Sequence, residues 1–302
     1  MSSPPAFRSL TADRAARDAS IATAVAAARQ QLRHTGLAAD VADLDARLIA
    51  QHVLGWTTER FLTDIHSIAP EGFKAAYDRL IGRRGAREPL AYIVGHREFW
   101  GLDIRVTPAV LVPRPETELL VEAALEWLSD RMAPAIIVDA CTGSGCVAIA
   151  LAFERPAARI VATDLSAPAL TVAHANAVRH GVAARVRLVR ADLLNGIAGP
   201  FDAILANPPY VPYCDSPALQ SEVADHEPSL AIFGGDDGMA VIRRLVPQAP
   251  ASIRRGGRLL FEFGLGQDDA VAELIEGTPG LTLVDQRRDL QGIPRIAVVQ
   301  RD

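Results

Sequence analysis

The sequence lacks the features that would place it in a membrane, in a disulfide-bonded secreted class or in a metal-binding class. No apolar run approaches the roughly 18 residues of a membrane-spanning helix, so we expect no membrane partner. The three cysteines form no C-x-x-C pair, and their odd number is typical of a reducing, cytoplasmic location. The seven histidines have no H-E-x-x-H spacing, and the sequence therefore predicts no metal site.

An excess of basic residues is also missing. Lys and Arg number 31 and Asp and Glu number 36, which gives a formal net charge of −5. A protein that holds nucleic acid through many phosphate contacts normally carries a basic face. The composition therefore predicts no direct nucleic-acid partner, while it leaves a basic protein substrate open.

The first part of the chain is predicted to be helical. Its 302 residues are enough for about two domains. Residues 1–17 lack an apolar signal core, and we expect a flexible tail there, not a secretion signal. Residues 18–88 favour a helical bundle without chemistry of its own, with a substrate-docking module as the alternative. The apolar faces expected at helical spacing are Ile21, Val25, Ala28 and Leu32, then Val41, Leu44, Leu48, Ile49 and Val53, and last Phe73, Tyr77, Leu80 and Ile81.

The rest of the chain is predicted to be an α/β domain. Residues 89–115 contain short alternating stretches and several prolines, which indicates a hairpin-like connector. Over residues 116–302 helices alternate with strands, which predicts a mostly parallel sheet, and a short turn between the last two strands adds an antiparallel edge. The expected strands are 135–140, 159–164, 185–192, 201–207, 256–264, 282–289 and 295–301, and one further helix is expected over 238–255.

A glycine-containing loop follows the first expected strand, which Asp139 closes. In such sheets the ligand lies at the carboxyl ends of the strands. Asp164 ends the second strand, where a carboxylate can bind ribose hydroxyls. This pattern predicts a nucleoside-containing cofactor, but it also satisfies the G-x-G-x-x-A of dinucleotide binding, and a plain tight turn is a further alternative. The loop residues that let the backbone approach a ligand are Thr142, Gly143, Ser144 and Gly145.

Asp192 ends the third expected strand, and Leu193 follows it. A carboxylate there can accept a hydrogen bond from the amino group of adenine, with the side chain of Leu193 against the ring. Three strand-end aspartates, Asp139, Asp164 and Asp192, would line the crevice with negative charge, which suits a cationic cofactor better than a pyrophosphate. This favours S-adenosylmethionine, a sulfonium, over a nicotinamide dinucleotide. For Asp192 alone, a helix cap or a surface acid is the alternative.

The fourth expected strand ends in the turn Asn207-Pro208-Pro209-Tyr210. The two prolines remove backbone donors and restrict φ, so the turn presents chiefly carbonyl acceptors, including that of Asn207. A planar NH₂ group fits between such acceptors while the Tyr210 ring covers its flat face, and acceptors placed in advance would stabilise charge that develops on nitrogen. We therefore expect catalysis to involve Asn207, Pro208 and Tyr210, and substrate binding to involve all four residues. A proline turn with a packed tyrosine is the alternative.

Five stretches of the chain resemble a known family. They are EPLAYIVGHREFWGLDIRVTPAVLVPRPETE, VDACTGSG, NPPY, HEPSLAIFGGDDG and RDLQGIPR, and the similarity covers roughly residues 20–302. They resemble the bacterial peptide chain release factor N5-glutamine methyltransferases, which are class I enzymes with a seven-strand, Rossmann-like domain. The connector stretch is more specific than NPPY, because NPPY is shared with adenine-amino DNA methyltransferases and some rRNA methyltransferases.

The resemblance implies an activity, a cofactor and a partner. The reaction would transfer a methyl group from S-adenosylmethionine to the side-chain amide nitrogen of the glutamine in the Gly-Gly-Gln motif of class I release factors, with S-adenosylhomocysteine as the product. The helical residues 18–88 would help to hold this protein substrate. The cofactor-binding residues implied, together with those argued above, are Asp139, Cys141, Thr142, Gly143, Ser144, Gly145, Asp164, Asp192, Leu193 and Asn207.

Cys141 departs from the family pattern, because many members have glycine there. A loop that contacts its ligand through the backbone is expected to tolerate this small side chain. The resemblance also places Arg114, Glu116 and Thr117 near the cofactor. Residues 211–235 form a long connection with little regular pattern, and their position after NPPY predicts a loop that helps to hold the substrate.

Other functions stay open on the residues alone. The nearest alternative is an amino-group methyltransferase that acts on adenine in DNA, on rRNA or on a ribosomal-protein glutamine. A nicotinamide oxidoreductase would explain the glycine loop and Asp164 but leaves NPPY without a role. A catalytically silent binding module would not need Asn207 and Tyr210 beside a complete cofactor loop.

Overall fold

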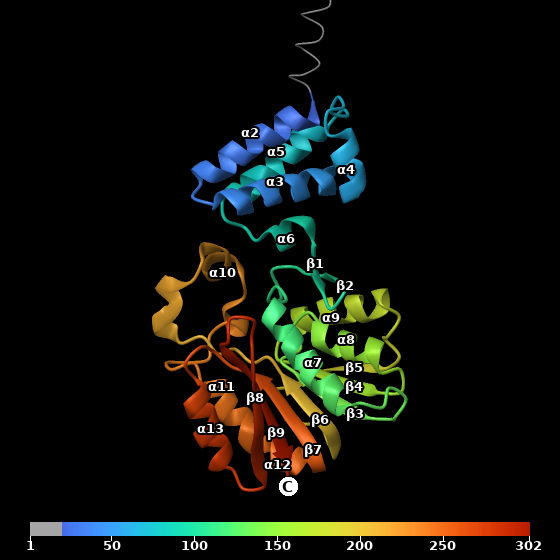
Figure 1. Cartoon of the computed structure of the whole chain (residues 1–302). Helices are drawn as coiled ribbons and strands as arrows, with labels where there is room; N and C mark the ends of the chain where they lie inside the picture. The colour runs from blue at the N-terminus through green and yellow to red at the C-terminus, as the bar shows by residue number, and fades with distance from the viewer. Residues whose placement is uncertain (1–19) are drawn as a thin grey trace, which may run out of the picture. The chain divides into compact units, whose positions relative to one another are not determined.

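A computed structural model of the chain describes residues 20–302, so the flexible tail predicted for residues 1–17 lies outside the described residues. The chain divides between Val94 and Gly95 into two compact units, each with a hydrophobic core of its own. Figure 1 labels the helices and strands of both units. Among residues 20–302, no helix is long and apolar enough to cross a membrane.

The smaller unit is a bundle of helices. The α2 helix begins where the Ser20 side chain accepts a hydrogen bond from the backbone N–H of Thr23. The α3 helix ends at Gly55, which has the left-handed conformation common at such ends. The helices of this unit are α2 (Ile21–His34), α3 (Ala39–Leu54), α4 (Thr58–Asp64), α5 (Phe73–Gly85) and α6 (Leu90–Val94).

The predicted apolar faces of this unit are confirmed for α2 and α5 and are partly wrong for α3. The apolar side chains predicted for α2 and α5 are buried. On α3, Val41 and Leu44 are 37% and 45% exposed, and the buried face contains Asp45 and Ala46 instead. On that face the Asp45 carboxylate pairs with the buried guanidinium of Arg84 on α5.

The sequence pattern did not predict the two short helices α4 and α6. The side chain of Thr57 caps α4 by accepting a hydrogen bond from the N–H of Arg60. Pro89 precedes α6, and its carbonyl accepts a hydrogen bond from the N–H of Tyr92. A proline is tolerated at a helix start because an N–H at that position would have no partner in the helix. Pro89 therefore opens a helix here.

The larger unit begins with a β-hairpin inside the segment 89–115. Its strands β1 (His96–Phe99) and β2 (Leu102–Arg105) pair antiparallel. The two turn residues, Trp100 and Gly101, have φ angles of 56° and 68°. Positive φ at both central positions is the geometry whose twist matches that of the flanking strands, and this explains the tight connection.

A seven-stranded sheet forms the centre of the larger unit, in the order β5-β4-β3-β6-β7-β9-β8. The first five strands in this order run parallel, whereas β9 is antiparallel to both of its neighbours. The predicted α/β class with a mostly parallel sheet and an antiparallel edge is confirmed. The strands are β3 (Ile136–Ala140), β4 (Arg159–Asp164), β5 (Val186–Arg190), β6 (Phe201–Ala206), β7 (Ile253–Glu262), β8 (Leu281–Arg288) and β9 (Pro294–Arg301).

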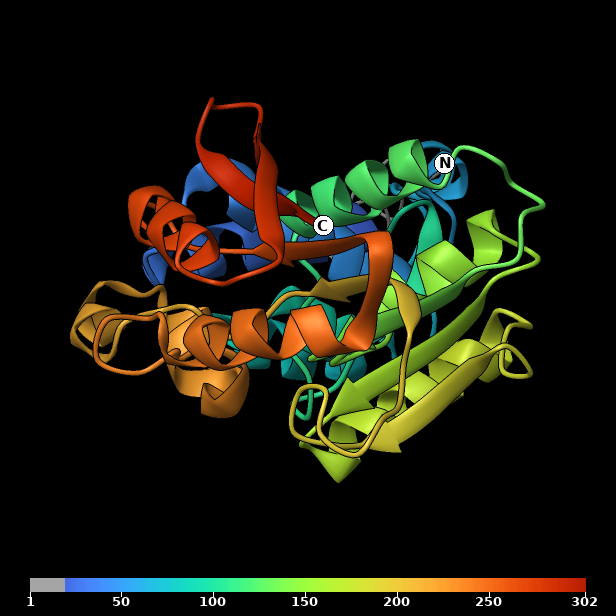
Figure 2. The same cartoon turned by 90° about the horizontal axis from the view of Figure 1, so that it is seen from below.

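Helices cover both faces of this sheet (Figure 2). On one face, alternate strand residues such as Val138, Ile204 and Leu259 form a core with side chains of α11, α12 and α13. The helix α7 contacts β6, β7 and β9, and α8 contacts β3, β4 and β5. The two helices also contact each other, and α9 packs beside α8. Because both faces are buried, the central strands are nearly continuous apolar runs. The helices are α7 (Glu118–Trp127), α8 (Cys146–Glu154), α9 (Ala167–Arg179), α11 (Ala240–Leu245), α12 (Ala249–Ser252) and α13 (Asp268–Glu276).

The prediction of a single helix over residues 238–255 is wrong. The segment consists of α11, a 3₁₀ turn at Val246–Gln248 and α12, and Ile253 already belongs to β7. Pro247 and Pro250 have no N–H to donate to an earlier turn, so a regular helix cannot continue through them.

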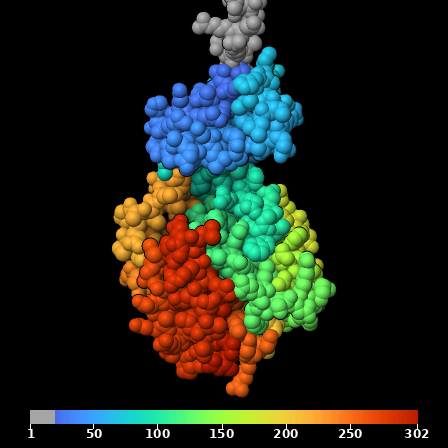
Figure 3. All heavy atoms as spheres, in the orientation of Figure 1, coloured from blue at the N-terminus to red at the C-terminus, as the bar shows by residue number. Residues whose placement is uncertain are grey.

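The connection over 211–235 has more regular structure than its sequence predicted. It contains a 3₁₀ helix at Tyr213–Ala218, α10 (Ser221–His226) and a 3₁₀ turn at Ser229–Ala231. Its two ends are joined, because the Val211 N–H donates to the Ile232 carbonyl at 3.0 Å and the Gly234 N–H donates to the Val211 carbonyl at 2.9 Å. The segment therefore leaves the sheet and returns to nearly the same point. Figure 3 shows its amber atoms on the surface of the larger unit.

The strand order reverses between β3 and β6, which are neighbours in the sheet although two strands separate them in the chain. Ala140 lies opposite Ala206, and Ala206 lies opposite Phe261 on β7. The residues that follow β3, β6 and β7 therefore come together at one edge. Such a reversal point at the carboxyl ends of the strands is where open α/β sheets bind ligands.

Candidate functional site

A cavity of about 220 Å³ lies among the segments that follow β3, β4, β5 and β6. Three of the predicted site residues, Gly145, Pro208 and Tyr210, lie outside its lining. The predicted residues that line it are Asp139, Cys141, Thr142, Gly143, Ser144, Asp164, Asp192, Leu193, Asn207 and Pro209. The structure thus brings most of the predicted residues to one cavity.

Asp139 is hydrogen-bonded to the glycine loop and to the helix that follows it. Its carboxylate accepts hydrogen bonds from the Thr142 hydroxyl at 2.5 Å and from the Ala148 N–H at 3.1 Å. The side chain is buried, and this burial raises the pKa of Asp139 to about 7, although the two hydrogen bonds oppose the shift. Asp139 is therefore tied into the loop.

The loop itself has three residues with positive φ, which are Cys141 at 60°, Gly143 at 54° and Gly145 at 81°. This conformation is open to glycine and costs other residues roughly 1–2 kcal/mol, so the cysteine carries a strain that glycine would not. A Cβ atom on Gly145 would lie 3.1 Å from the Cβ atom of Ala173. Gly145 thus serves the close packing of α8 on α9 and does not line the cavity.

The two cysteines at the cavity are not poised as nucleophiles. Burial raises the pKa of the Cys141 thiol well above its usual range, and the nearby Asp164 carboxylate adds to the shift. Burial also raises the pKa of the Cys146 thiol to about 12. Since the thiolate is the reactive form, both side chains behave as small apolar groups at neutral pH.

Asp164 links the end of β4 to the glycine loop. Its Oδ2 accepts a hydrogen bond from the Gly143 N–H at 2.9 Å, and its Oδ1 accepts one from the Ser166 N–H at 2.8 Å. Burial raises the pKa of Asp164, whereas these backbone hydrogen bonds lower it. Its position on the cavity wall is the one that the sequence predicted for a ribose partner.

Asp192 forms an ion pair with Arg244, which also lines the cavity. The lining is therefore less negative than three free strand-end aspartates would make it, because Arg244 offsets one of them. The sequence did not single out Arg244, which comes from α11. Leu193 is 4% exposed, and its carbonyl accepts a hydrogen bond from the Thr163 hydroxyl at 2.9 Å.

The NPPY turn is held from two sides. The Asn207 Nδ2 donates a hydrogen bond to the hydroxyl oxygen of Thr117 at 3.0 Å. The Tyr210 hydroxyl donates to Oε1 of Glu262 at 2.9 Å, and the Tyr210 carbonyl accepts from Nε2 of Gln267 at 2.9 Å. Pro208 is buried. Within residues 20–302, the Asn207 Oδ1 has no hydrogen-bond partner, so it can accept one from a ligand.

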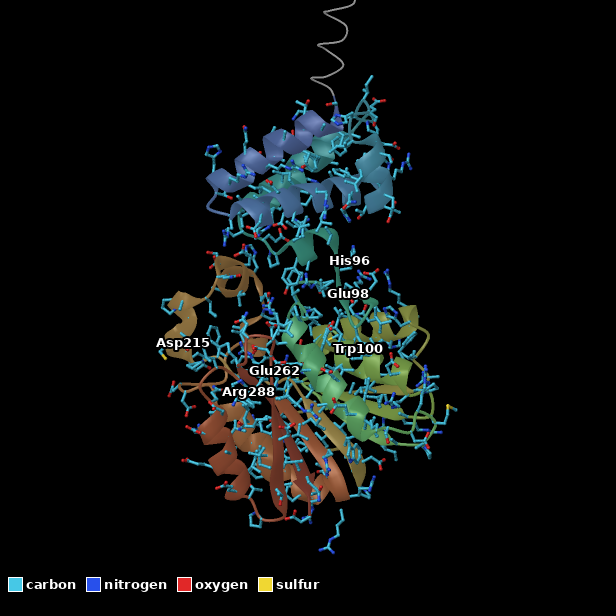
Figure 4. All side chains as sticks on the ribbon, in the orientation of Figure 1. His96, Glu98, Trp100, Asp215, Glu262 and Arg288 are labelled. Atoms are coloured by element: carbon cyan, nitrogen blue, oxygen red, sulfur yellow. The ribbon has the colours of Figure 1, made fainter. Side chains whose placement is uncertain are left out.

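Glu262 was missed by the sequence analysis, because it ends a strand that was predicted only as a core element. It is 1% exposed and accepts hydrogen bonds from both Thr117 and Tyr210. Figure 4 labels it within the larger unit. A charged residue at the end of an apolar strand, in the stretch LLFEFG, was the available signal.

Asn176 on α9 was missed as well. It is fully buried, and its Nδ2 donates to the carbonyls of Ser144 and Arg105, both at 2.9 Å. Its Oδ1 accepts from the Arg105 N–H at 2.8 Å. Asn176 therefore joins the glycine loop to the β1–β2 hairpin. The available signal was a polar residue on the apolar face of a predicted helix.

Arg114, in the segment 89–115, forms an ion pair with the 211–235 segment. Its Nη2 lies 2.8 Å from Oε1 of Glu227, whose side chain is 1% exposed. Burial raises the pKa of Glu227, and the charge of Arg114 lowers it. Arg114 and Thr117 line the cavity, whereas Glu116 lies outside the lining.

Comparison with known proteins matches both units to established families. Residues 23–95 match the PrmC N-terminal domain, and residues 116–222 match the methyltransferase small domain. A release factor glutamine methyltransferase of Nitratidesulfovibrio vulgaris is 41% identical over 91% of this chain and 93% of its own. One of Cereibacter sphaeroides is 42% identical over 91% of this chain and 96% of its own.

A solved structure supports the fold of the larger unit. The catalytic domain of hMettl16, in complex with a MAT2A 3′UTR hairpin, has a TM-score of 0.55 at 16% identity, over 70% of this chain and 81% of that one. At this identity the similarity concerns the fold alone. The sheet and the matched domain make the larger unit a class I methyltransferase. The chain belongs to the release factor glutamine methyltransferase family, which confirms the resemblance seen in the sequence.

Proposed function

We propose that this protein transfers a methyl group from S-adenosylmethionine to the side-chain amide nitrogen of the glutamine in the Gly-Gly-Gln motif of class I peptide chain release factors. The names of its relatives support the substrate, and the site supports the chemistry. The observation that carries the proposal is the carboxamide of Asn207. Its NH₂ group donates to Thr117, Asn207 lines the cavity, and within residues 20–302 its oxygen has no hydrogen-bond partner.

The residues around the cavity fit S-adenosylmethionine. Asp164 would bind the ribose hydroxyls, and Leu193 would contact the adenine ring beside Asp192. The glycine loop, from Cys141 to Ser144, brings its backbone to the same wall. When bound, the cofactor supplies an electrophilic methyl group on a positively charged sulfur.

The turn at Asn207 would orient the substrate amide. An amide nitrogen is a weak nucleophile because its lone pair is delocalised, and charge develops on it as it attacks. The Oδ1 atom of Asn207 and the carbonyls of the turn would accept hydrogen bonds from the substrate NH₂ group and stabilise that charge. Because Tyr210 and Pro208 are held by the surrounding protein, the acceptors are positioned before the substrate arrives.

The proposal is tested by mixing the purified protein with labelled S-adenosylmethionine and a bacterial class I release factor. A second reaction contains the same factor with the glutamine of Gly-Gly-Gln changed to alanine, and a third contains DNA and rRNA. We expect label on the intact factor alone. Label on nucleic acid would support the amino-group methyltransferase alternative and contradict the proposed substrate.

Asp164→Ala is expected to weaken cofactor binding by roughly 1.5–3 kcal/mol, the value of a hydrogen bond to a charged group. The physical reason is that a ribose hydroxyl would lose its acceptor on the cavity wall. Isothermal titration calorimetry with S-adenosylhomocysteine measures the change. Thermal unfolding of the same variant shows whether the loss of the Gly143 contact affects folding. An unchanged dissociation constant would show that Asp164 is not the ribose partner.

Shortening the 211–235 segment is expected to raise the KM for the release factor while cofactor affinity is retained. Replacement of residues 214–225 by two glycines removes all of α10 except His226 and keeps the hydrogen bonds at the base. It also keeps the cavity-lining residues of the segment, which are Pro228, Leu230, Ala231 and Phe233. Steady-state methylation with varied release factor gives the KM, and calorimetry gives the cofactor affinity. Equal methylation rates in both proteins would argue against substrate holding by this segment.

The helical unit keeps its predicted role of helping to hold the protein substrate. The match of residues 23–95 to the N-terminal domain model supports this assignment. The predicted absence of a nucleic-acid, membrane or metal partner and the predicted cytoplasmic location likewise stay predictions.

A further inference from the structure

We propose that Glu262 is a positioning residue for methyl transfer. It orients Asn207 indirectly, through Thr117, and it orients Tyr210 by a direct hydrogen bond. The inference rests on the proposed function, because it explains how the turn that would hold the substrate amide is itself held. None of the three side chains would donate or accept the transferred methyl group. Their role is to determine which atom of Asn207 faces the substrate.

The contacts converge on one buried carboxylate. Oε2 of Glu262 accepts a hydrogen bond from the Thr117 hydroxyl at 2.7 Å, and Oε1 accepts one from the Tyr210 hydroxyl at 2.9 Å. Glu262 is 1% exposed and Thr117 is 2% exposed, so water does not compete for these bonds. The pairing of Ala206 with Phe261 places Glu262 beside Asn207 at the ends of β6 and β7.

The direction of these bonds determines the orientation of the Asn207 carboxamide. The Thr117 hydroxyl has a single proton, and it donates that proton to Oε2 of Glu262. The hydroxyl oxygen can then only accept, and the Asn207 atom that faces it must be the NH₂ group, at 3.0 Å. Oδ1 is therefore directed away from Thr117. With the opposite orientation, the carboxamide would present N–H groups to the N–H groups of a glutamine substrate.

The same chain of bonds strengthens Oδ1 as an acceptor. Hydrogen bonds in a buried chain polarise one another. An NH₂ group that donates into the chain that ends at the Glu262 carboxyl group shifts electron density to the carboxamide oxygen. Burial raises the pKa of Glu262, while the bonds from Thr117 and Tyr210 lower it. Glu262 thereby supports both acceptor strength and geometry from outside the cavity.

Isosteric substitutions at Thr117 test this role. Thr117→Val keeps the shape and removes the hydroxyl, and we expect kcat for release-factor methylation to fall at least about tenfold, the scale of a misplaced reacting group. Cofactor affinity should be nearly unchanged. Thr117→Ser restores the hydroxyl and should recover most of the lost turnover. Glu262→Gln should lower kcat in the same way, because the two hydroxyls donate to different oxygens of Glu262 and one of them would then face an NH₂ group.

Thr278→Val is the matched control. Thr278 is also buried, at 8% exposed, and its hydroxyl donates only to the Leu274 carbonyl within its own helix end, at 2.7 Å. This variant should keep the wild-type kcat. An unchanged kcat in Thr117→Val, or an equal loss in Thr278→Val, would overturn the proposal.

A double-mutant cycle separates positioning from general support of the fold. If Thr117 acts through Asn207, Thr117→Val should have little further effect on kcat in an Asn207→Ala background. A loss of the same size in both backgrounds would show that Thr117 acts elsewhere and would overturn the inference.

A spectroscopic measurement distinguishes failure of this inference from failure of the proposed function. The side-chain NH₂ signals of Asn207 are assigned in a ¹⁵N–¹H spectrum by their loss in Asn207→Ala. We expect them to shift in Thr117→Val and in Glu262→Gln and to return in Thr117→Ser, with no substrate present. Unmoved signals would overturn the network even if the wild-type protein methylates a release factor. Shifted signals without methylation of a release factor would instead contradict the proposed substrate.

Discussion

Asn207→Ala is expected to lower the turnover number of glutamine methylation by about 10²–10³-fold, the cost of removing one pre-organised polar group that stabilises transition-state charge. The alanine cannot accept a hydrogen bond from the substrate NH₂ group. The loss of this hydrogen bond raises the energy of the transition state most, because the charge on nitrogen is largest there. The prolines and Tyr210 would still confine the amide, so some activity should remain.

Cofactor binding by Asn207→Ala provides the internal comparison. We expect the dissociation constant of S-adenosylhomocysteine to change little, since Asn207 forms one part of a wall to which the glycine loop, Asp164 and Leu193 also contribute. Asn195→Ala is a suitable control, because Asn195 is exposed in a turn and lies outside the cavity lining. Wild-type turnover in Asn207→Ala would refute the amide clamp.

Asp45→Ala is expected to lower the free energy of unfolding of the helical unit by about 3–5 kcal/mol, the cost of removing one member of a buried ion pair. Arg84 Nε lies 2.6 Å from the Asp45 carboxylate, and the two side chains are 5% and 6% exposed. Removal of the carboxylate takes this contact away from a guanidinium that stays in the low-dielectric core. The effect should be confined to the helical unit because the larger unit has a separate core.

Hydrogen exchange followed by mass spectrometry localises this loss, with peptides from residues 95–302 as the internal reference. Asp43→Ala is the matched control, because the Arg33–Asp43 pair is 46% and 41% exposed and such surface pairs contribute about 1 kcal/mol or less. The double variant Asp45→Leu, Arg84→Met should recover much of the lost stability, since it buries no charge. Equal exchange in Asp45→Ala and Asp43→Ala would contradict the argument.

The predictable part of the fold follows from local periodicity. Helical spacing of Ile21, Val25, Ala28 and Leu32 identified the buried face of α2, because side chains three and four residues apart share a face. The same reasoning was partly wrong for α3, where Val41 and Leu44 were predicted on the buried face and Asp45 was not. Asp45 is buried in an ion pair with Arg84, far away in the sequence, and periodicity contains no information about such a partner.

The candidate site divides in a similar way. The positions of Asp139, Asp164 and Asp192 at strand ends could be predicted, because each follows an apolar run that has the length of a strand. Their partners could not. Asp192 pairs with Arg244, which lies in a segment that was predicted only as one further helix over residues 238–255. For this reason, the negative charge of the crevice, which was inferred from the three acids alone, was overestimated.

The sequence by itself determined the chemical parts of this protein. The glycine loop, the strand-end acids and Asn207-Pro208-Pro209-Tyr210 are short-range patterns, and the five stretches together were specific enough to indicate the family that the comparisons then confirmed. These parts are recognisable because their function depends on residues that are adjacent in the chain.

Only the tertiary structure decided how these parts are held. Thr117 and Glu262 are 145 residues apart, and Arg114 and Glu227 are 113 residues apart, yet each pair is in hydrogen-bond contact. These contacts depend on the strand order, which places β6 between β3 and β7, and on the register that sets Ala206 opposite Phe261. Strand order and register arise from the packing of both sheet faces at once, so they are properties of the folded core that no local pattern of residues specifies.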